Sequence, residues 1–277
     1  MKRKFVHTAL VLVLCILLTV ITQVGGVVLL CSIPLLRLLN RFVTHTWKRG
    51  AAHALAFLTS YLLATLFIVP EVAPIFGRKA LPITGQQVQP LHASTWLLNR
   101  HYVRPELWDL TTQVAIALDQ HHPGTKVAYL DANFPFMDGF PLLPHLSHDD
   151  GKKLDIAFLF KDPEGRPLSG QARTILGYGG YEAPAADEPD FPAQCARKGH
   201  WQYSLLGKII PASKNDQLRF DEDRTADLIN LLTARPEVGK VFLEPHLKTR
   251  LGLTSDKVRF HGCQAVRHDD HIHVQLR

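Results

Sequence analysis

A segment near the C-terminus reads Arg267-His268-Asp269-Asp270-His271-Ile272-His273-Val274-Gln275-Leu276-Arg277. From His271 onward, polar and apolar residues alternate, which is the pattern of a β-strand with one face in a core. Successive side chains of a strand point to opposite faces, so His271 and His273 project from the same face. The segment therefore predicts a half-buried strand that presents two imidazoles together.

A second histidine-rich cluster lies far upstream and reads Ser147-His148-Asp149-Asp150-Gly151-Lys152-Lys153-Leu154-Asp155. His148 and Asp155 are an odd number of positions apart, so on one continuous strand they would face opposite sides. We therefore expect His148 on a loop that bends at Gly151, and Asp155 within a buried strand at 153–160. A lone Asp in such a strand is costly unless something pairs it, and a metal ion would do so.

The two clusters together offer the ligands of one metal ion. We predict that His148, Asp155 and His273 bind Zn²⁺ and leave the fourth position to water, as in catalytic zinc sites. Zinc lowers the pKa of such a water to roughly 7 and polarises a carbonyl group. His268 is then placed to act as general base, and His271 to donate to the oxyanion that forms.

Other interpretations of these residues are weaker. A Ser147/His148/Asp155 triad competes, but adjacent side chains rarely converge, and the triad leaves the two strand histidines unexplained. His145 is either structural or a substrate contact. The Gly-Tyr-Gly-Gly stretch at 177–180 is not a phosphate loop, because neither Lys-Ser/Thr nor Rossmann spacing follows it.

The cysteines exclude one kind of zinc site and leave a pairing open. No Cys-x-x-Cys spacing exists, so a thiolate zinc ribbon is excluded. Cys195 and Cys263 lie outside the apolar N-terminal runs. They either pair in an oxidising compartment or remain two isolated thiols.

The N-terminal part of the chain has the composition of a membrane region. Two runs, 5–36 and 50–70, lack Asp, Glu, Lys and Arg, and about 20 apolar residues suffice to cross a bilayer as a helix. We predict a hairpin of two transmembrane helices connected by residues 37–49; alternatively, Gly25-Gly26 divides the first run into two short spans. Basic residues flank both runs, so the positive-inside rule leaves the orientation open.

The charge is divided unevenly along the chain. Nine basic residues and one acidic residue precede position 80, whereas the remainder carries 22 basic and 24 acidic residues, so the overall charge of +6 combines +8 and −2. The sequence pI of about 9.2 therefore reflects charge that flanks the membrane. A nucleic-acid-binding face would need basic residues clustered on the folded domain, and we predict no nucleic-acid partner.

Periodicity elsewhere predicts an α+β fold with a mostly antiparallel sheet and flanking helices, preceded by the α-helical membrane region. The predicted helices cover 105–120, 221–234 and, more briefly, 245–251. The predicted strands cover 126–130, 153–160, 240–243, 258–260 and 271–276. Residues 161–200 are rich in Gly, Pro and acidic residues and are predicted to be loop-like.

Residues 125–277 resemble the LAS metallopeptidases, the zinc fold named after lysostaphin, D-Ala-D-Ala peptidases and the hedgehog domain. The resemblance rests on a His148-x₆-Asp155 motif followed downstream by His271-x-His273. The segment His268-Asp269-Asp270-His271-Ile272-His273 is similar to the corresponding motif of penicillin-insensitive murein endopeptidases. Residues 240–251 are also similar to a segment of those proteins. The resemblance implies zinc bound by His148, Asp155 and His273, with His268 as base and His271 assisting in the transition state.

The resulting hypothesis is a membrane-anchored zinc peptidase. Residues 1–80 would form the anchor, 81–105 a linker and 106–277 a zinc metallopeptidase-like domain. By resemblance, the substrate is the peptide part of peptidoglycan, which places the enzyme in the bacterial inner membrane with its domain in the periplasm. A D,D-carboxypeptidase and a non-catalytic zinc-stabilised binding domain remain alternatives, and the sequence makes no prediction of oligomeric state.

Overall fold

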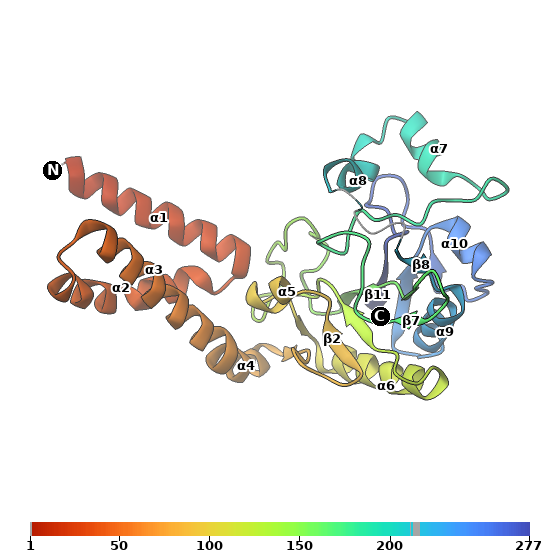
Figure 1. Ribbon diagram of the computed structural model, residues 1–277, viewed down its shortest axis with the longest axis horizontal. Coiled ribbons are helices and arrows are strands. Elements are labelled where there is room, and N and C mark those ends of the chain that lie inside the picture. The colour runs from red at the N-terminus through yellow and green to blue at the C-terminus, as the bar shows by residue number, and fades with distance from the viewer. Residues whose placement is uncertain (1, 211, 213–216) are drawn as a thin grey trace.

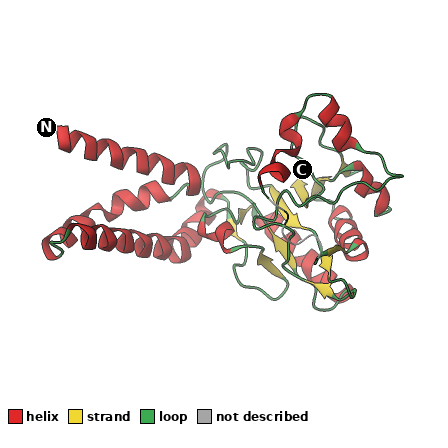
Figure 2. Ribbon diagram, turned by 45° about the horizontal axis from the view of Figure 1, so that its top comes forward, coloured by secondary structure: helices red, strands yellow, loops and turns green. Residues whose placement is uncertain are grey.

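The computed structural model describes residues 2–210, 212 and 217–277. It has an all-helical N-terminal part and a C-terminal part that contains the strands (Figures 1 and 2). The N-terminal helices are α1 (Lys2–Thr22), α2 (Gly25–Phe42), α3 (Thr46–Leu63), a π-helical turn (Ala64–Ile68), α4 (Val69–Val72) and a 3-10 turn (Ala73–Phe76).

Two of these helical stretches, Gly25–Phe42 and Thr46–Phe76, are long and apolar enough to cross a membrane. The first apolar run, however, is not one span, because the chain turns at Gln23 (φ 62°) and divides the run into α1 and α2. At the start of α2 a Cβ on Gly26 would lie 2.0 Å from the Thr19 hydroxyl oxygen. Only glycine allows the two helices to approach so closely. The division near Gly25-Gly26 is therefore the alternative that the structure has.

The second domain is built on a six-stranded sheet with the order β10-β9-β11-β5-β4-β2. Its strands are β2 (Val88–Pro90), β4 (Val127–Tyr129), β5 (Lys153–Ala157), β9 (Val238–Phe242), β10 (Val258–Arg259) and β11 (His271–Leu276). The central pairs are antiparallel, but β2–β4 and β9–β10 are parallel. The α+β class is confirmed, and among the described residues the sheet is mixed, with three antiparallel and two parallel pairings. Parallel neighbours need a crossover, which α6 (Pro105–His121) and α10 (Pro245–Arg250) supply.

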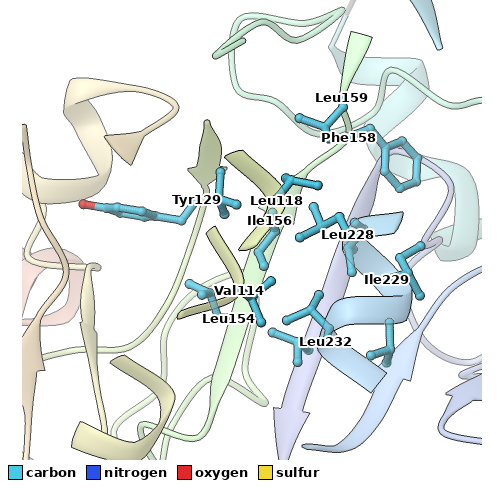
Figure 3. Packing of buried hydrophobic residues seen from close by; sticks show 14 of the residues in the cluster. Val114, Leu118, Tyr129, Leu154, Ile156, Phe158, Leu159, Leu228, Ile229 and Leu232 are labelled. Atoms are coloured by element: carbon cyan, nitrogen blue, oxygen red, sulfur yellow. The ribbon is translucent and has the colours of Figure 1, made fainter. Parts of the chain in front are cut away.

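Two helices, α6 and α9 (Glu222–Thr233), cover one face of this sheet (Figure 3). Val114 of α6 and Leu228 of α9 pack over Leu154 and Ile156 of β5 in the main hydrophobic core. Because side chains alternate along β5, Asp155 points to the opposite face. The helices therefore stabilise the sheet from one side, and the polar groups gather on the other.

Two segments that were predicted to lack regular structure, 81–105 and 161–200, contain helices and strands. The supposed linker at 81–105 contains β2, which pairs in register with β4 because Val88 lies opposite Val127. The strand was not predicted, because a strand this short, next to prolines, has no readable periodicity. The additional elements are β1 (Lys79–Ala80), α5 (Ala93–Leu97), β3 (Tyr102–Val103), β6 (Phe160–Lys161), β7 (Pro167–Leu168), α7 (Phe191–Arg197), a 3-10 turn (Trp201–Ser204), α8 (Leu205–Ile209) and β8 (Arg219–Phe220).

The N-terminal helices contact the second domain through a small buried cluster. Tyr102 of β3 is fully buried among Val24, Tyr61, Val69 and Ala73. The Tyr61 hydroxyl donates to the Leu97 carbonyl oxygen at 2.7 Å. These contacts dock the helices on the domain rather than leaving it on a flexible tether.

Candidate metal centre

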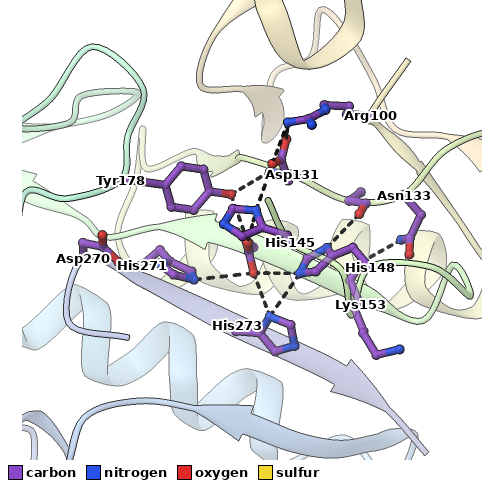
Figure 4. A network of polar contacts seen from close by, with 12 residues as sticks. Arg100, Asp131, Asn133, His145, His148, Lys153, Tyr178, Asp270, His271 and His273 are labelled. Carbon is purple, nitrogen blue, oxygen red and sulfur yellow. Dashed lines mark hydrogen bonds and ion pairs between the residues drawn. The ribbon is translucent and has the colours of Figure 1, made fainter. Parts of the chain in front are cut away.

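The three predicted ligands converge on the face of the sheet opposite the helices. Figure 4 shows two of them, His148 and His273. Asp155 on β5 lies directly opposite His273 on β11 in the antiparallel register, so both side chains share one face. His148 reaches them from the loop before β5, which turns at Gly151 with φ 78°. One ligand atom from each residue lies within 4.8 Å of the others, and all three residues are buried.

The distances within this triad suit a single metal ion. The Nε2 atom of His148 lies 3.2 Å from Nδ1 of His273 and 3.3 Å from Oδ1 of Asp155. Nδ1 of His273 lies 2.8 Å from the same carboxylate oxygen. A tetrahedral zinc ion with bonds of about 2.0–2.1 Å spaces its ligand atoms about 3.3–3.4 Å apart. The group can therefore hold one ion after a small expansion, and its donors also suit other first-row divalent metals.

Hydrogen bonds on the far side orient two of these ligands. Nδ1 of His148 donates to the carbonyl oxygen of Ala132 at 2.7 Å, which leaves the Nε2 lone pair facing the triad. The hydroxyl of Tyr178 donates to Oδ2 of Asp155 at 2.9 Å, which leaves Oδ1 facing the two histidines. Metal ligands in proteins are typically held by such outer partners.

Electrostatics favour the protonation state that a metal ligand needs at two of the three residues, Asp155 and His273. Burial raises the pKa of Asp155, but the neighbouring His148 and His271 outweigh it and hold that pKa well below its usual range. Burial lowers the pKa of His273 to about 4, so this imidazole is neutral. For His148, burial also lowers the pKa, but Asp155 more than compensates and raises it. Metal binding would therefore displace a proton from His148.

The two predicted catalytic histidines lie next to the triad and differ in charge. His271 places Nε2 3.6 Å from Oδ1 of Asp155, and its Nδ1 contacts the Asp270 carboxylate. Burial lowers the pKa of His271, but Asp155 and Asp270 together raise it to about 9. His271 is therefore a proton donor at neutral pH.

His268 lies beside His271 and His273, with ring centroids 5.0 and 5.6 Å away. It is buried, and its Nδ1 atom has no hydrogen-bond partner among the described residues. Burial, and then the charges of His271 and His273, hold its pKa well below the usual range. His268 is therefore neutral and can accept a proton.

Apart from His145, which was predicted to be structural or a substrate contact, the residues around the triad were not predicted to take part. Tyr178 belongs to the Gly-Tyr-Gly-Gly stretch and touches a ligand carboxylate, a role for which its flanking glycines are the only local signal. His145 bonds through Nδ1 to Asp131 at 2.9 Å, and Asp131 pairs with Arg100 at 3.0 Å. A cavity of about 180 Å³ lies beside this network, lined by Arg100, Asp131, His145 and Tyr178 together with apolar side chains.

The competing serine triad is not assembled. Ser147 is exposed, whereas both ring nitrogens of His148 contact other partners, Ala132 on one side and His273 and Asp155 on the other. Asp270, which precedes β11, accepts a hydrogen bond from Nδ1 of His271. Asp269 is also buried and pairs with Arg267 rather than facing solvent.

A disulfide joins Cys195 of α7 to Cys263, with Cα atoms 5.2 Å apart. Pairing is therefore the alternative that the structure has. Cys263 lies in the loop between β10 and the histidine segment at 267–273, so the bond restrains the chain just before His268. Disulfides of this kind persist in oxidising compartments outside the cytosol.

Comparison of the chain with protein-family models and with curated protein sequences finds no match. No relative therefore supplies a function by similarity. The assignment of an activity rests on the chemistry of the metal centre and on the spacing of its motifs.

Proposed function

We propose that this protein is a membrane-anchored zinc-dependent peptidase that hydrolyses peptide bonds in peptidoglycan. One observation carries the proposal: three buried ligand atoms converge, and two further histidines, His268 and His271, lie beside them. Structural zinc sites are closed by four protein ligands, whereas catalytic sites use three and keep one position open. The described residues supply three ligands, which supports a catalytic rather than a structural ion.

The residues around the triad divide the proton transfers between them. Zinc, when bound, supplies an activated water and polarises the carbonyl that is attacked. His268 is neutral and buried within reach of the triad, so it accepts the proton and later returns it to the leaving amine. Asp270 engages Nδ1 of His271, and because the raised pKa makes the ring an imidazolium, Nε2 also carries a proton with which it stabilises negative charge on the attacked oxygen.

The substrate class and the location are inferred from features outside the triad. The spacings His148-x₆-Asp155 and His268-x-x-His271-x-His273 are similar to those of murein endopeptidases, which supports the peptide of cross-linked peptidoglycan as substrate. Two apolar helices and the Cys195–Cys263 disulfide support a bacterial inner-membrane protein whose domain faces the periplasm. A reporter fused after Arg277 tests this orientation, and activity only of a cytoplasmic reporter contradicts it.

The decisive experiment combines metal analysis with digestion. The full chain, purified in detergent micelles, is expected to contain about one zinc per chain and to cleave purified cross-linked muropeptides. Mass spectrometry of the products separates an endopeptidase, which cuts the cross-link, from a carboxypeptidase, which releases a terminal residue. A wild-type protein that binds no zinc, or that cleaves neither substrate with zinc bound, contradicts the proposal.

A further inference from the structure

We infer that the loop Gly177-Tyr178-Gly179-Gly180, hereafter the glycine loop, positions the metal centre by holding two of its carboxylates at once. The hydroxyl of Tyr178 fixes the ligand Asp155, and the backbone N–H of Gly179 fixes Asp270, which in turn holds His271. The inference rests on the metal site of the proposed function and assigns a task to a motif that the catalytic scheme leaves unused.

The first contact fixes the direction of a ligand carboxylate. Tyr178 accepts a hydrogen bond from the backbone N–H of Asp131 at 3.1 Å, and it donates its own proton to Oδ2 of Asp155 at 2.9 Å. With an N–H on one side of the hydroxyl oxygen, its single hydrogen is directed to the carboxylate. Burial, and then the charge of Asp155, raise the pKa of Tyr178 well above its usual range, so the hydroxyl stays protonated.

The second contact reaches the other half of the site. The N–H of Gly179 donates to Oδ2 of Asp270, whose Oδ1 contacts Nδ1 of His271. The Tyr178 ring also packs edge-on against His271, with centroids 5.0 Å apart. Two neighbouring residues of one loop therefore set the orientation of a metal ligand and of the proton donor.

The sequence of the glycine loop explains why it can make both contacts. Gly177 and Gly179 have φ values of 81° and 83°, in the left-handed region that favours glycine. A Cβ on Gly179 would also lie 3.1 Å from backbone atoms of Leu206. The Thr174 hydroxyl donates to the Tyr178 carbonyl oxygen at 2.7 Å and holds the loop from its other end.

The expected consequence is a preorganised, single-oxygen ligand. With Oδ2 engaged by Tyr178, Asp155 offers Oδ1 to the ion and pays no further rotational entropy on binding. Loss of such an outer partner typically weakens metal affinity about 10–100-fold. The glycine loop should therefore be visible in metal binding itself, apart from any effect on hydrolysis.

The test compares two tyrosine-to-phenylalanine variants of the full chain in detergent micelles. Zinc affinity is measured by competition with a chromogenic chelator. Tyr178→Phe is expected to bind zinc about 10–100-fold more weakly than wild type. The control Tyr129→Phe removes a buried hydroxyl that donates to the Pro82 carbonyl at 2.9 Å, and it is expected to leave the affinity unchanged.

The outcomes separate this inference from the proposed function. Wild-type zinc binding with an equally tight Tyr178→Phe variant overturns the positioning role alone, whereas a wild type that binds no zinc overturns the proposed function. Near-ultraviolet circular dichroism of the metal-free proteins shows whether each variant is folded. If Tyr178→Phe is unfolded, Thr174→Val is used instead, because it loosens the glycine loop without contacting Asp155. Weaker zinc binding by this variant supports the inference, and unchanged binding overturns it.

Discussion

The two sides of the metal centre are held in different ways. On the ligand side, His148 and Asp155 each have a hydrogen-bond partner behind them, Ala132 and Tyr178. On the proton-transfer side, His268 has no described partner for Nδ1 and lies among rings, including Phe242 at 5.6 Å. A ligand has to keep one direction, whereas a base has to take up and release a proton. In the proposed scheme, hydrogen bonds therefore position the metal ligands and packing positions the base.

The largest effect is expected on the ligand side. Asp155→Asn removes the only negative charge among the three ligands. Zinc affinity should therefore fall by more than the loss expected for an outer partner, which is about 10–100-fold. Metal content after gel filtration measures the loss. Asp149→Asn is a matched control, because Asp149 is partly exposed and pairs with Lys153. Full zinc occupancy in the Asp155 variant would show that the triad is not the metal site.

On the other side, His268→Ala should separate catalysis from metal binding. Loss of a general base typically slows the reaction about 10²–10⁴-fold, and the zinc content should be unchanged because His268 is not a ligand. Rates on cross-linked muropeptides and metal analysis are measured on the same preparation. His261→Ala is the control, since that exposed ring lies 5.4 Å from His268 but outside the triad. Loss of zinc together with activity would show that His268 is a metal ligand and not only a base, which contradicts the comparison.

Removal of the disulfide tests how much the proton-transfer side depends on a covalent link for stability. Cys263→Ser should lower the free energy of unfolding by about 2–4 kcal/mol, because the bond closes a long loop in the unfolded chain. Urea unfolding of the full chain in detergent, followed by near-ultraviolet circular dichroism, measures the change. Cys31→Ser removes an exposed free thiol and should have no such effect. Equal stability of the two variants would count against the bond.

The smallest effect is expected on stability, from the pair in which Nε of Arg250, at the end of α10, donates to Glu188 at 2.8 Å. The hydrogen bond from Arg250 lowers the pKa of Glu188 from 4.5 to about 2. A lowered folded-state pKa stabilises the protein above about pH 4.5, and this contribution is lost as the pH falls toward 2. Glu188→Gln should therefore remove about 0.2–1 kcal/mol at pH 7 and flatten the stability profile between those values. A profile identical to wild type would show that the pair contributes nothing.

The convergence of the ligands follows from sequence patterns that are local. Alternation in β11 correctly places His271 and His273 on one face, and the odd spacing from His148 to Asp155 correctly requires a bend, found at Gly151. Helices α6 and α9 were also predicted near their observed bounds, because their apolar stripes extend over several turns.

The features that were missed depend on distant partners. The strand character of β2 exists only because β4 pairs with it, and three residues are too few for periodicity. Tyr178 gains its role from Asp155, on another element, and the glycines beside it indicate a special loop but not that contact. The division of the first apolar run was predicted only as an alternative, and its turn was not placed at Gln23 because glutamine rarely adopts positive φ.

The buried Tyr102 cluster also determines how this protein can be divided. Truncation after residue 80 would remove Val24, Tyr61 and Val69 from around Tyr102 and expose an apolar patch on the domain. A cut at residue 105 would also delete β2 and open an edge of the sheet. With α2 and α3 in a bilayer, the same docking gives the metal centre a fixed height above the lipid surface. If the protein is the proposed wall peptidase, this height would limit it to the layer of wall nearest the membrane.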